Sequence, residues 1–348
     1  MDVGRQEAPV RPPHTRPRPR AVLAMAPGVR EEVFGHEALR RLGELTELHD
    51  QVLHEVSSPD ALRALAGAEV LVTGWGCPKI DAGLLDRAPG LRLVAHAAGT
   101  VKTFLDPAVL ERGVRVCSAA DANAVPVAEF TFAAIVFGAK RAFTLARRYR
   151  ERGTRRDFSG LPWLGTRGVT VGLVGLSRIG RRVMGLLGGL DADVLVYDPY
   201  ADPAGIAELG GTAVDLDTLV RRSHVVSLHA PETRETRRML DARRLSMLRD
   251  GAVVVNTARG GLVDTDALVK EVRSGRLDAI LDVSDPEPLP AGHPLFDLPN
   301  AFVTPHLAGA QGNELGRLAE STLGEIARYA AGLPLLHEID RGELDRMA

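Results

Sequence analysis

The sequence predicts an α/β protein with two doubly wound parallel-sheet domains, and three observations support this. The chain has 348 residues, whereas a single domain usually takes about 100–200. Short apolar runs alternate with segments of helical periodicity, which is typical of a parallel sheet covered by helices. One of these runs, at 169–175, ends in a glycine turn that begins a helix, as in nucleotide-binding α/β domains.

The first domain is predicted over residues 21–119. Its strands and helices are expected to alternate in this order: the strand RAVLAMA (20–26), the helix EEVFGHEALRRLGEL (31–45), the helix SPDALRAL (58–65), the strand EVLVTGW (69–75), the helix DAGLLDRA (81–88) and the strand LRLVAHAAG (91–99). Such alternation favours parallel pairing, because each helix returns the chain to the starting edge of the sheet.

Residues 1–20 are predicted to be a disordered, solvated tail. They contain five prolines and five arginines and no apolar run, so they resemble neither a folded element nor a secretory signal. A nucleic-acid-binding arm is the alternative for this segment. It is disfavoured because the whole chain carries a net charge of −2, and general nucleic-acid binding depends on a basic field.

One long helix is expected over residues 126–153, with Pro126 in its first turn and Gly153 at its end. Its apolar part, at 127–139, has 13 residues and includes Glu129, whereas a membrane span needs about 20 apolar residues. We therefore expect a buried helix and no membrane span. The basic run at 140–156 has little aromatic interleaving, which favours a solvated face over nucleic-acid binding.

The second sheet is predicted from six further runs. They are VTVGLVG (169–175), DVLVYD (193–198), HVVSLHA (224–230), GAVVVNTA (251–258), LDAILDV (277–283) and AFVTPH (301–306). Most are β-branched and lack alternation, as expected for strands buried on both faces. A final helix is predicted near residues 313–332.

The turn after the first of these strands has the features of a dinucleotide-binding fingerprint. Its residues are Gly175, Ser177, Arg178, Ile179 and Gly180. The helix that follows can bind a pyrophosphate at its N-terminus, and Asp198, 18 residues beyond Gly180, can accept hydrogen bonds from ribose hydroxyls. Ser177 replaces the usual middle glycine, so its backbone approaches a phosphate less closely, although its hydroxyl can donate to one.

Three polar residues at the ends of later strands are the best candidates for catalysis. Arg259 can hold a carboxylate through two parallel hydrogen bonds, His306 can exchange a proton near neutral pH, and Glu287 can keep that imidazole charged and oriented. Together they suit a 2-hydroxy or 2-keto acid. Each has a plainer alternative: a loop histidine, a turn carboxylate, and an arginine paired with Asp264.

The cysteines point to no disulfide framework and no metal cluster. Only Cys77 and Cys117 are present, and they form no CxxC pair. We therefore expect no bound metal and a cytoplasmic location.

Six ordered motifs give the chain a resemblance to a known family. They are NAVPVAE (123–129), VGLVGLSRIG (171–180), SLHAPETRETRRML (227–240), VVNTARGGLVDTDAL (254–268), DVSDPEP (282–288) and TPHLAG (304–309). The chain resembles the D-isomer-specific 2-hydroxyacid dehydrogenases, which include phosphoglycerate dehydrogenases. The resemblance implies a flavodoxin-like substrate domain, from residues 21–119 and 310–340, and a Rossmann NAD-binding domain, from residues 120–309, with the catalytic cleft between them.

The resemblance also assigns site residues. It makes Arg259 the substrate-binding arginine, His306 the general acid/base and Glu287 its partner. The cofactor set gains four residues, which are His229, Pro231, Thr257 and Asp282. The segment HAAGTVK (96–102) lies where the family has a turn whose backbone amides hold the substrate carboxylate. Its candidate contacts are Ala98, Gly99, Thr100 and Lys102; Val101 and Lys102 replace the family's Asp-Asn pair.

The expected activity is hydride transfer between NAD(H) and a D-2-hydroxy acid or its 2-keto acid, in a homodimer that pairs through the long helix. Two alternatives remain. A phosphite-type dehydrogenase would keep the same three catalytic residues, whereas a formate enzyme would have glutamine at position 287. An NAD-sensing co-repressor would bind partner peptides without needing turnover.

Overall fold

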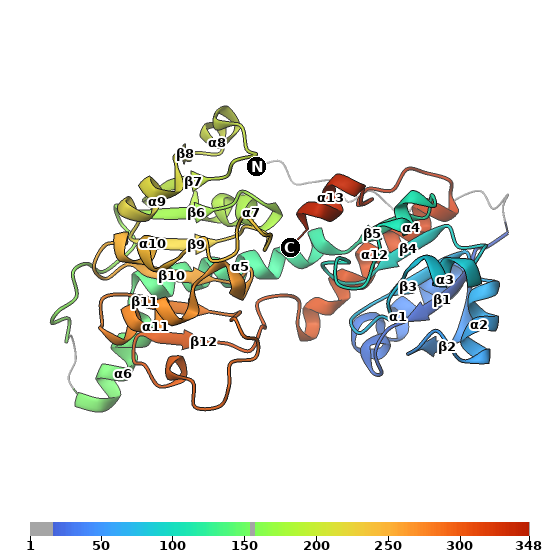
Figure 1. Cartoon of the computed structure of the whole chain (residues 1–348), viewed down its shortest axis with the longest axis horizontal. Coiled ribbons are helices and arrows are strands. Elements are labelled where there is room, and N and C mark those ends of the chain that lie inside the picture. The colour runs from blue at the N-terminus through green and yellow to red at the C-terminus, as the bar shows by residue number, and fades with distance from the viewer. Residues whose placement is uncertain (1–16, 154–156, 348) are drawn as a thin grey trace. The chain divides into compact units, whose positions relative to one another are not determined.

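The computed structural model describes residues 17–153 and 157–347 and divides the chain into two compact units (Figure 1). Unit 1 contains the residues up to Ala119 together with Leu315–Leu344. Unit 2 contains Ala120–Glu314 and the last residues from Asp345 onward. Each unit has one parallel sheet with helices packed against it, so the predicted fold class is confirmed.

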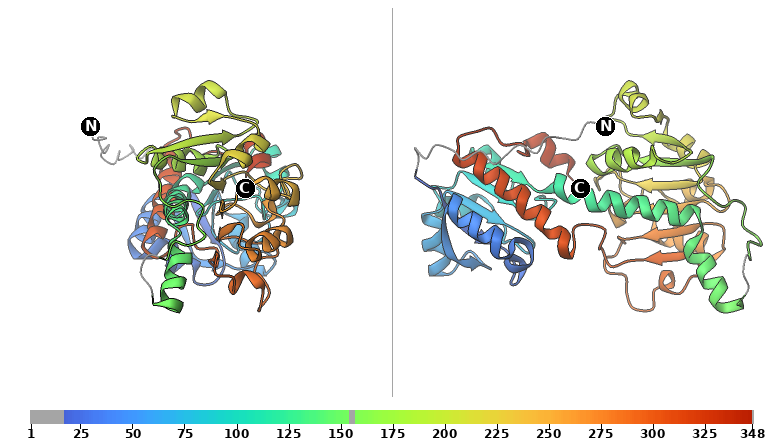
Figure 2. Two further views of the ribbon diagram at one scale, coloured as in Figure 1. Left: turned by 90° about the vertical axis from the view of Figure 1, so that its left-hand side faces the viewer. Right: turned by 180° about the vertical axis from the view of Figure 1, so that it is seen from behind.

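Unit 1 has a five-stranded sheet in the order β2-β1-β3-β4-β5, which is the flavodoxin-like order. Its strands are β1 (Arg20–Ala24), β2 (Glu47–Leu53), β3 (Val70–Thr73), β4 (Leu93–His96) and β5 (Arg115–Ser118). Its helices are α1 (Val29–Leu45), α2 (Pro59–Ala66), α3 (Ala82–Arg87), α4 (Ala108–Glu111), α12 (Leu315–Ala330) and α13 (Arg341–Arg346). The C-terminal α12 packs against α1 near the other end of the sequence (Figure 2, right).

Burial explains which strands of unit 1 the sequence pattern reveals. All four residues of β3 and of β4 are buried, and both strands were predicted from their apolar runs. The edge strand β2 reads ELHDQVL and buries only Leu53, so its pattern is too polar to indicate a strand. β5 was missed as well; it is buried at three of its four positions but has only four residues.

The predicted tail is shorter than expected where the structure describes it. Residues 1–16 lie outside the described residues. Arg18 donates a hydrogen bond to the Gly43 carbonyl (2.9 Å), and Arg20 already begins β1. Arg20 pairs with Glu47 of β2, so the last residue of the predicted tail already belongs to the sheet, as the strand expected at 20–26 requires.

Unit 2 has a seven-stranded parallel sheet in the order β12-β11-β10-β9-β6-β7-β8. Counted from β6, this is the Rossmann order with one further strand at the β11 edge. Its strands are β6 (Val169–Val174), β7 (Ala192–Tyr197), β8 (Thr212–Ala213), β9 (Val225–Leu228), β10 (Val253–Asn256), β11 (Asp278–Leu281) and β12 (Ala301–Val303). Its helices are α5 (Ala120–Ala139), α6 (Ala142–Arg152), α7 (Arg178–Leu187), α8 (Pro203–Glu208), α9 (Leu216–Arg222), α10 (Ala242–Met247) and α11 (Thr265–Arg273). The sequence missed only β8 among these strands; it has two residues.

The single long helix expected at 126–153 is wrong. The structure has α5 and α6, separated at Arg141, whose φ is 54°. The Arg141 guanidinium is buried, pairs with Asp278 (2.8 Å) and lies over the Trp163 ring at 4.4 Å. These contacts hold Arg141 in the left-handed region and end the first helix. The expected end at Gly153 is correct, since Gly153 caps α6 with φ 64°.

The start of α5 also differs from the prediction. It begins at Ala120, so Pro126 lies inside the helix instead of in its first turn. With 20 residues, α5 is long and apolar enough to cross a membrane, contrary to the expectation from the sequence. Half of it is buried inside the structure, where it packs along β9 and β10 (Figure 2, right). A core helix passes the same length and composition test, so this is weak support for a span.

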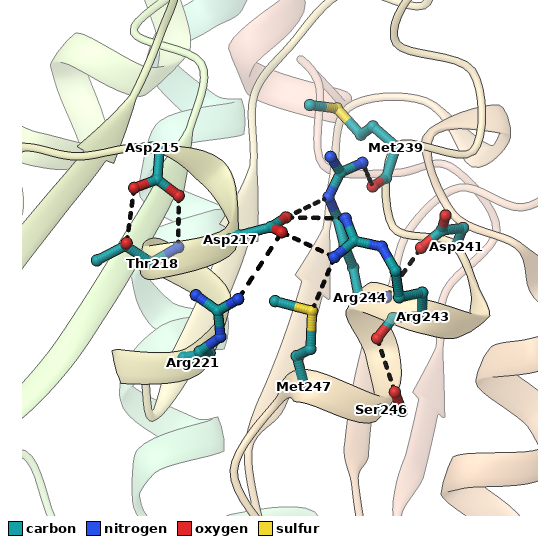
Figure 3. A network of polar contacts seen from close by, with 10 residues as sticks. All are labelled: Asp215, Asp217, Thr218, Arg221, Met239, Asp241, Arg243, Arg244, Ser246 and Met247. Carbon is teal, nitrogen blue, oxygen red and sulfur yellow. Dashed lines mark hydrogen bonds and ion pairs between the residues drawn. The ribbon is translucent and has the colours of Figure 1, made fainter.

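Charged contacts join α9 to α10 on the surface of unit 2 (Figure 3). The Asp217 carboxylate accepts hydrogen bonds from Arg243 (2.7 and 3.0 Å) and Arg244 (3.0 Å). Arg221 lies 3.9 Å away on the next turn of α9. The neighbouring guanidinium groups lower the pKa of Asp217 well below its usual range. Asp217 therefore stays ionised and links the two helices at any physiological pH.

Candidate active site

The glycine turn after β6 is shaped by close packing against the loop after β9. Gly175 has φ 97°, and a Cβ there would lie 2.7 Å from the Ala230 nitrogen. A Cβ at Gly180 would meet the Gly175 carbonyl oxygen. Both positions therefore require glycine, and the turn leads directly into the N-terminus of α7. This backbone cradle fits a dinucleotide pyrophosphate.

Ser177 is compatible with this turn although it replaces a glycine. Its φ is −64° and its ψ is −177°, which any residue adopts. Its hydroxyl accepts a hydrogen bond from the Gly180 nitrogen (3.4 Å) and caps α7. Arg178 is exposed and pairs with Asp121 (3.1 Å), and Ile179 packs partly buried on the core.

The buried face of α7 packs on the sheet of unit 2. Gly180, Val183, Met184 and Leu187 are buried, which is an i, i+3, i+4, i+7 pattern. Leu186 lies outside this face and is 38% exposed.

Asp198 follows β7 and ties two loops together. Its Oδ2 accepts a hydrogen bond from the Leu176 nitrogen (2.7 Å), and its Oδ1 accepts one from the Tyr200 nitrogen (2.8 Å). The carboxylate is thus fixed beside the glycine turn. Each oxygen keeps a second lone pair for another donor.

His229, Pro231 and Thr257 lie at the ends of the central strands. His229 is buried; its Nε2 contacts Ser227 Oγ (2.9 Å), and its Nδ1 has no partner in the described part of the chain. Burial lowers the pKa of His229 to about 3, so the ring is neutral at physiological pH. The Pro231 carbonyl accepts a hydrogen bond from the Thr236 hydroxyl (2.6 Å). The buried Thr257 hydroxyl contacts Thr131 Oγ1 of α5 (2.6 Å).

Arg259 projects from a turn that Asn256 holds in place. The Asn256 amide donates to the Arg259 carbonyl (2.8 Å) and accepts from the Ala258 nitrogen (3.1 Å). The Arg259 guanidinium donates to the Ala258 carbonyl (2.6 Å). Its burial lowers the pKa of the guanidinium, while the charges of Glu287 and Glu232 raise it. Desolvation of this kind strengthens the attraction of Arg259 for an incoming carboxylate.

His306 and Glu287 are in direct contact. His306 Nδ1 lies 2.5 Å from Glu287 Oε1, and about half of each side chain is exposed. The structure thus places two of the three proposed catalytic side chains in contact, and the charge of Glu287 raises the pKa of the third, Arg259. Asp264, the alternative partner of Arg259, instead caps α11 through the Ala267 nitrogen (3.0 Å).

Asp282 fixes the backbone that carries His306. Its buried carboxylate accepts hydrogen bonds from the Thr304 hydroxyl (2.6 Å) and from the nitrogens of Leu307 (2.8 Å) and Ala308 (2.9 Å). Its carbonyl accepts one from the His306 nitrogen (2.9 Å). These bonds stabilise His306 at φ 54°, a conformation that costs a residue with a side chain about 1–3 kcal/mol.

The candidate carboxylate turn belongs to unit 1. Ala98 is buried, Gly99 and Thr100 are partly exposed, and Lys102 is exposed. The Lys102 backbone nitrogen donates a hydrogen bond to Thr100 Oγ1 (3.3 Å). Val101 is fully buried, which explains why an apolar residue stands there. His96 ends β4 in front of the turn, and its buried ring contacts the Thr73 hydroxyl (2.9 Å).

The sequence analysis missed several residues that shape the site. Asn256 positions Arg259 through the Arg259 carbonyl, and Thr304 positions Asp282 through its carboxylate. Both are polar residues at the carboxyl end of an apolar strand, and that position alone marks a candidate. Glu232 and Arg237 were missed for a different reason, because only the folded loops bring Arg237 into contact with both Glu232 and Asp285.

Comparisons with known proteins identify the family of the chain. Residues 132–308 match the family model described as D-isomer specific 2-hydroxyacid dehydrogenase, NAD binding domain. A glyoxylate reductase of Thermofilum pendens is 34% identical over 292 residues, which cover 80% of this chain and 85% of that protein. The chain belongs to the D-isomer specific 2-hydroxyacid dehydrogenase family. Unit 2 therefore carries the NAD-binding domain of this family.

Other members of the family are similar over most of the chain. A D-3-phosphoglycerate dehydrogenase of Mycobacterium leprae is 37% identical over 289 residues, covering 81% of this chain and 54% of that protein. The chain thus spans about half the length of the first curated dehydrogenases it matches. A crystal structure of a Thermus thermophilus protein superposes with a TM-score of 0.74 at 34% identity, covering 92% of this chain and all of that one.

Proposed function

We propose that the protein is an NAD-dependent D-2-hydroxyacid dehydrogenase that interconverts a 2-hydroxy acid and its 2-keto acid. The observation that carries this proposal is the contact between His306 and Glu287 beside the partly buried Arg259. This arrangement offers a proton carrier, a group that orients it, and a cation for the substrate carboxylate.

Each of the three side chains has a defined task. Arg259 binds the substrate carboxylate through two parallel hydrogen bonds, which a lysine cannot reproduce. His306 Nε2 removes the proton of the substrate hydroxyl in oxidation and returns it in reduction. Glu287 holds Nδ1 of the same ring, which orients Nε2 toward the substrate. Bound NAD supplies the hydride acceptor or donor.

The residues that would hold NAD are the glycine turn, the N-terminus of α7 and Asp198. The residues fit because Gly175 and Gly180 allow the turn to pack closely against the Ala230 backbone and against itself, which leads the chain directly into the N-terminus of α7. His229, Pro231, Thr257 and Asp282 would complete the cofactor pocket from the ends of β9, β10 and β11. The neutral His229 adds no charge there.

We expect a preference for NAD over NADP. The Asp198 carboxylate can accept both ribose hydroxyls and would repel a 2′-phosphate, and residues 199–205 contain no arginine to neutralise one. Asp198→Ala should reduce the ratio of kcat/KM with NADH to that with NADPH. Asp198→Ala also loses the hydrogen bond from the Leu176 nitrogen. Asp198→Asn is the matched control, because its side-chain amide oxygen can still accept that bond. Equal or faster turnover of NADPH by the wild type would contradict the assignment.

The steady-state assay that tests the proposed function uses NADH with a panel of 2-keto acids, and NAD with D-2-hydroxy acids and phosphite. Turnover of a 2-keto acid with strict D-stereochemistry supports the proposal. Turnover of phosphite alone would favour the phosphite-type alternative, since that chemistry uses the same three residues. Tight NADH binding without turnover of any compound would favour a co-repressor.

We propose that Lys102 provides a second anion contact in the substrate turn formed by Ala98, Gly99 and Thr100. Only four of the 43 basic residues are lysine, and one stands exposed in this turn. Lys102→Ala should raise KM for D-3-phosphoglycerate much more than for D-lactate, because only the first loses a charge-assisted bond worth roughly 1.5–3 kcal/mol. Equal effects on both substrates would show that Lys102 does not select the substrate.

We also propose a homodimer that pairs through the α5–α6 face of unit 2. Phe137 and Tyr149 on these helices are 50% and 55% exposed, and large exposed apolar side chains favour an interface. Light scattering during size-exclusion chromatography should give twice the mass of 37.3 kDa. Phe137→Glu should shift the mass toward that of one chain. Tyr200→Glu, at an 85% exposed position in the loop after β7, should leave the mass unchanged.

A further inference from the structure

The loop after β9 places a second carboxylate beside the turn that carries Arg259. Both carboxylate oxygens of Glu232 lie where a side chain at position 261 would begin, so Gly261 is required for this packing. The loop is fixed there by backbone bonds from Arg238 to the Gly261 carbonyl (2.7 Å) and from Leu240 to the Leu262 carbonyl (3.0 Å). The Glu232 carboxylate therefore lies against Gly261, which follows Arg259 by two residues in the chain.

The charge of Glu232 is shared with another arginine. Arg237 Nη1 pairs with Glu232 Oε1 (2.6 Å), and its Nη2 pairs with Asp285 (2.9 Å). Asp285 lies in the loop that carries Glu287, so Arg237 bridges the loops after β9 and β11. The Arg237 backbone nitrogen donates to the Thr233 carbonyl (3.0 Å), which fixes the point from which its side chain extends.

Glu232 also acts on Arg259. It is one of the two carboxylates whose charges raise the pKa of that guanidinium. The other, Glu287, contacts His306, whereas Glu232 is occupied by Arg237. A carboxylate without such a partner at this position would pair with Arg259 and compete with the carboxylate of the substrate.

We propose that Arg237 is a positioning residue that holds Glu232 away from Arg259, so that the Arg259 guanidinium remains available to the substrate carboxylate. The inference rests on the proposed function of Arg259. It assigns to the Glu232–Arg237–Asp285 bridge a role in substrate affinity, because the bridge determines which carboxylate Arg259 binds.

The kinetic test uses Arg237→Ala and the double variant Arg237→Ala/Glu232→Gln. In Arg237→Ala, KM for the 2-keto acid should rise about tenfold, as expected for competition by one charge-assisted contact, with kcat changed less than twofold and the Kd of NADH unchanged. The double variant should return KM to within about threefold of wild type, because the competing charge is gone. Arg237→Lys should be intermediate.

Arg243→Ala is the matched control. Arg243 is 53% exposed and pairs with Asp217, which is 29% exposed (Figure 3). The Arg237 and Glu232 side chains have closely similar exposed fractions, 51% and 30%. Arg243→Ala should leave KM unchanged. An unchanged KM in Arg237→Ala would overturn the proposal. So would a raised KM that the added Glu232→Gln change does not restore, because if the bridge were only structural, removing Glu232 as well would not lower KM.

A second measurement does not depend on turnover. Phenylglyoxal modifies accessible guanidinium groups, and mass spectrometry of the peptide that contains Arg259 gives its rate of labelling. Labelling of Arg259 should be slower in Arg237→Ala than in wild type, and normal in the double variant. If the wild type reduces no 2-keto acid but this pattern is found, the proposed function fails and the effect of Arg237 on Arg259 stands. Equal labelling of Arg259 in all three proteins would overturn the proposed effect of Arg237 on Arg259.

Discussion

Replacing His306 with asparagine should abolish most of the turnover and leave the Kd of NADH nearly unchanged. Asparagine can still hydrogen-bond to Glu287, but it cannot accept and return a proton. General acid/base catalysis contributes about 10²–10⁴-fold, so we expect kcat to fall by that range. Stopped-flow measurement of NADH oxidation gives the rate of the chemical step, and NADH fluorescence titration gives the Kd.

The backbone at position 306 makes asparagine the suitable replacement. Residue 306 has φ 54°, and asparagine tolerates this region better than most residues with a side chain. Folding should therefore be preserved. Glu287→Gln should have a milder effect, since the proton carrier remains. If His306→Asn retains more than about a tenth of wild-type kcat, a barrier change of about 1.4 kcal/mol, then His306 is not the acid/base.

Replacing Arg259 with lysine should lower kcat/KM for the 2-keto acid roughly 10- to 150-fold, although the positive charge is kept. Lysine offers a point charge where Arg259 offers two parallel donors, and a lost charge-assisted bond costs about 1.5–3 kcal/mol. The ammonium would also lie in a partly buried turn, where burial already lowers the pKa of Arg259. Steady-state kinetics with one 2-keto acid at saturating NADH measures this effect.

The control for Arg259→Lys is Arg249→Lys. Arg249 is a surface residue of the same unit that contacts His224 (3.0 Å), and its replacement should not change kcat/KM. The Tm of both variants should stay near that of wild type, because a lysine keeps a charged donor for the Ala258 carbonyl that Arg259 binds. A wild-type kcat/KM in Arg259→Lys would show that the substrate carboxylate is bound elsewhere.

The sequence predicted the parts of the fold in which local pattern and burial agree. The buried strands of both sheets have apolar runs, and the glycine turn at 175–180 has a pattern that only a strand followed by a helix explains. The polar edge strand β2 and the two-residue β8 gave no such signal. The break at Arg141 depends on Asp278 and Trp163, which lie far along the chain, so no local pattern could reveal it.

The candidate site followed the same division. Arg259, Glu287 and His306 each stand at the end of an apolar run in a recognisable motif, and the structure places His306 in contact with Glu287. The bridge through Arg237 could not be predicted, because its partners Glu232 and Asp285 lie five and 48 residues away. Although the three residues lie in the motifs at 227–240 and 282–288, the sequence does not show that they contact one another; loop packing brings them together.

The glycine turn after β6 is held from three sides: Asp198 binds the Leu176 nitrogen, the Ala230 backbone packs against Gly175, and Ser177 caps α7. These internal contacts hold the backbone that would meet the pyrophosphate in one conformation. Binding NAD then orders almost no main chain, so little conformational entropy is lost at this step. The heat-capacity change of binding should accordingly reflect the apolar surface that the dinucleotide covers, with no added contribution from loop folding.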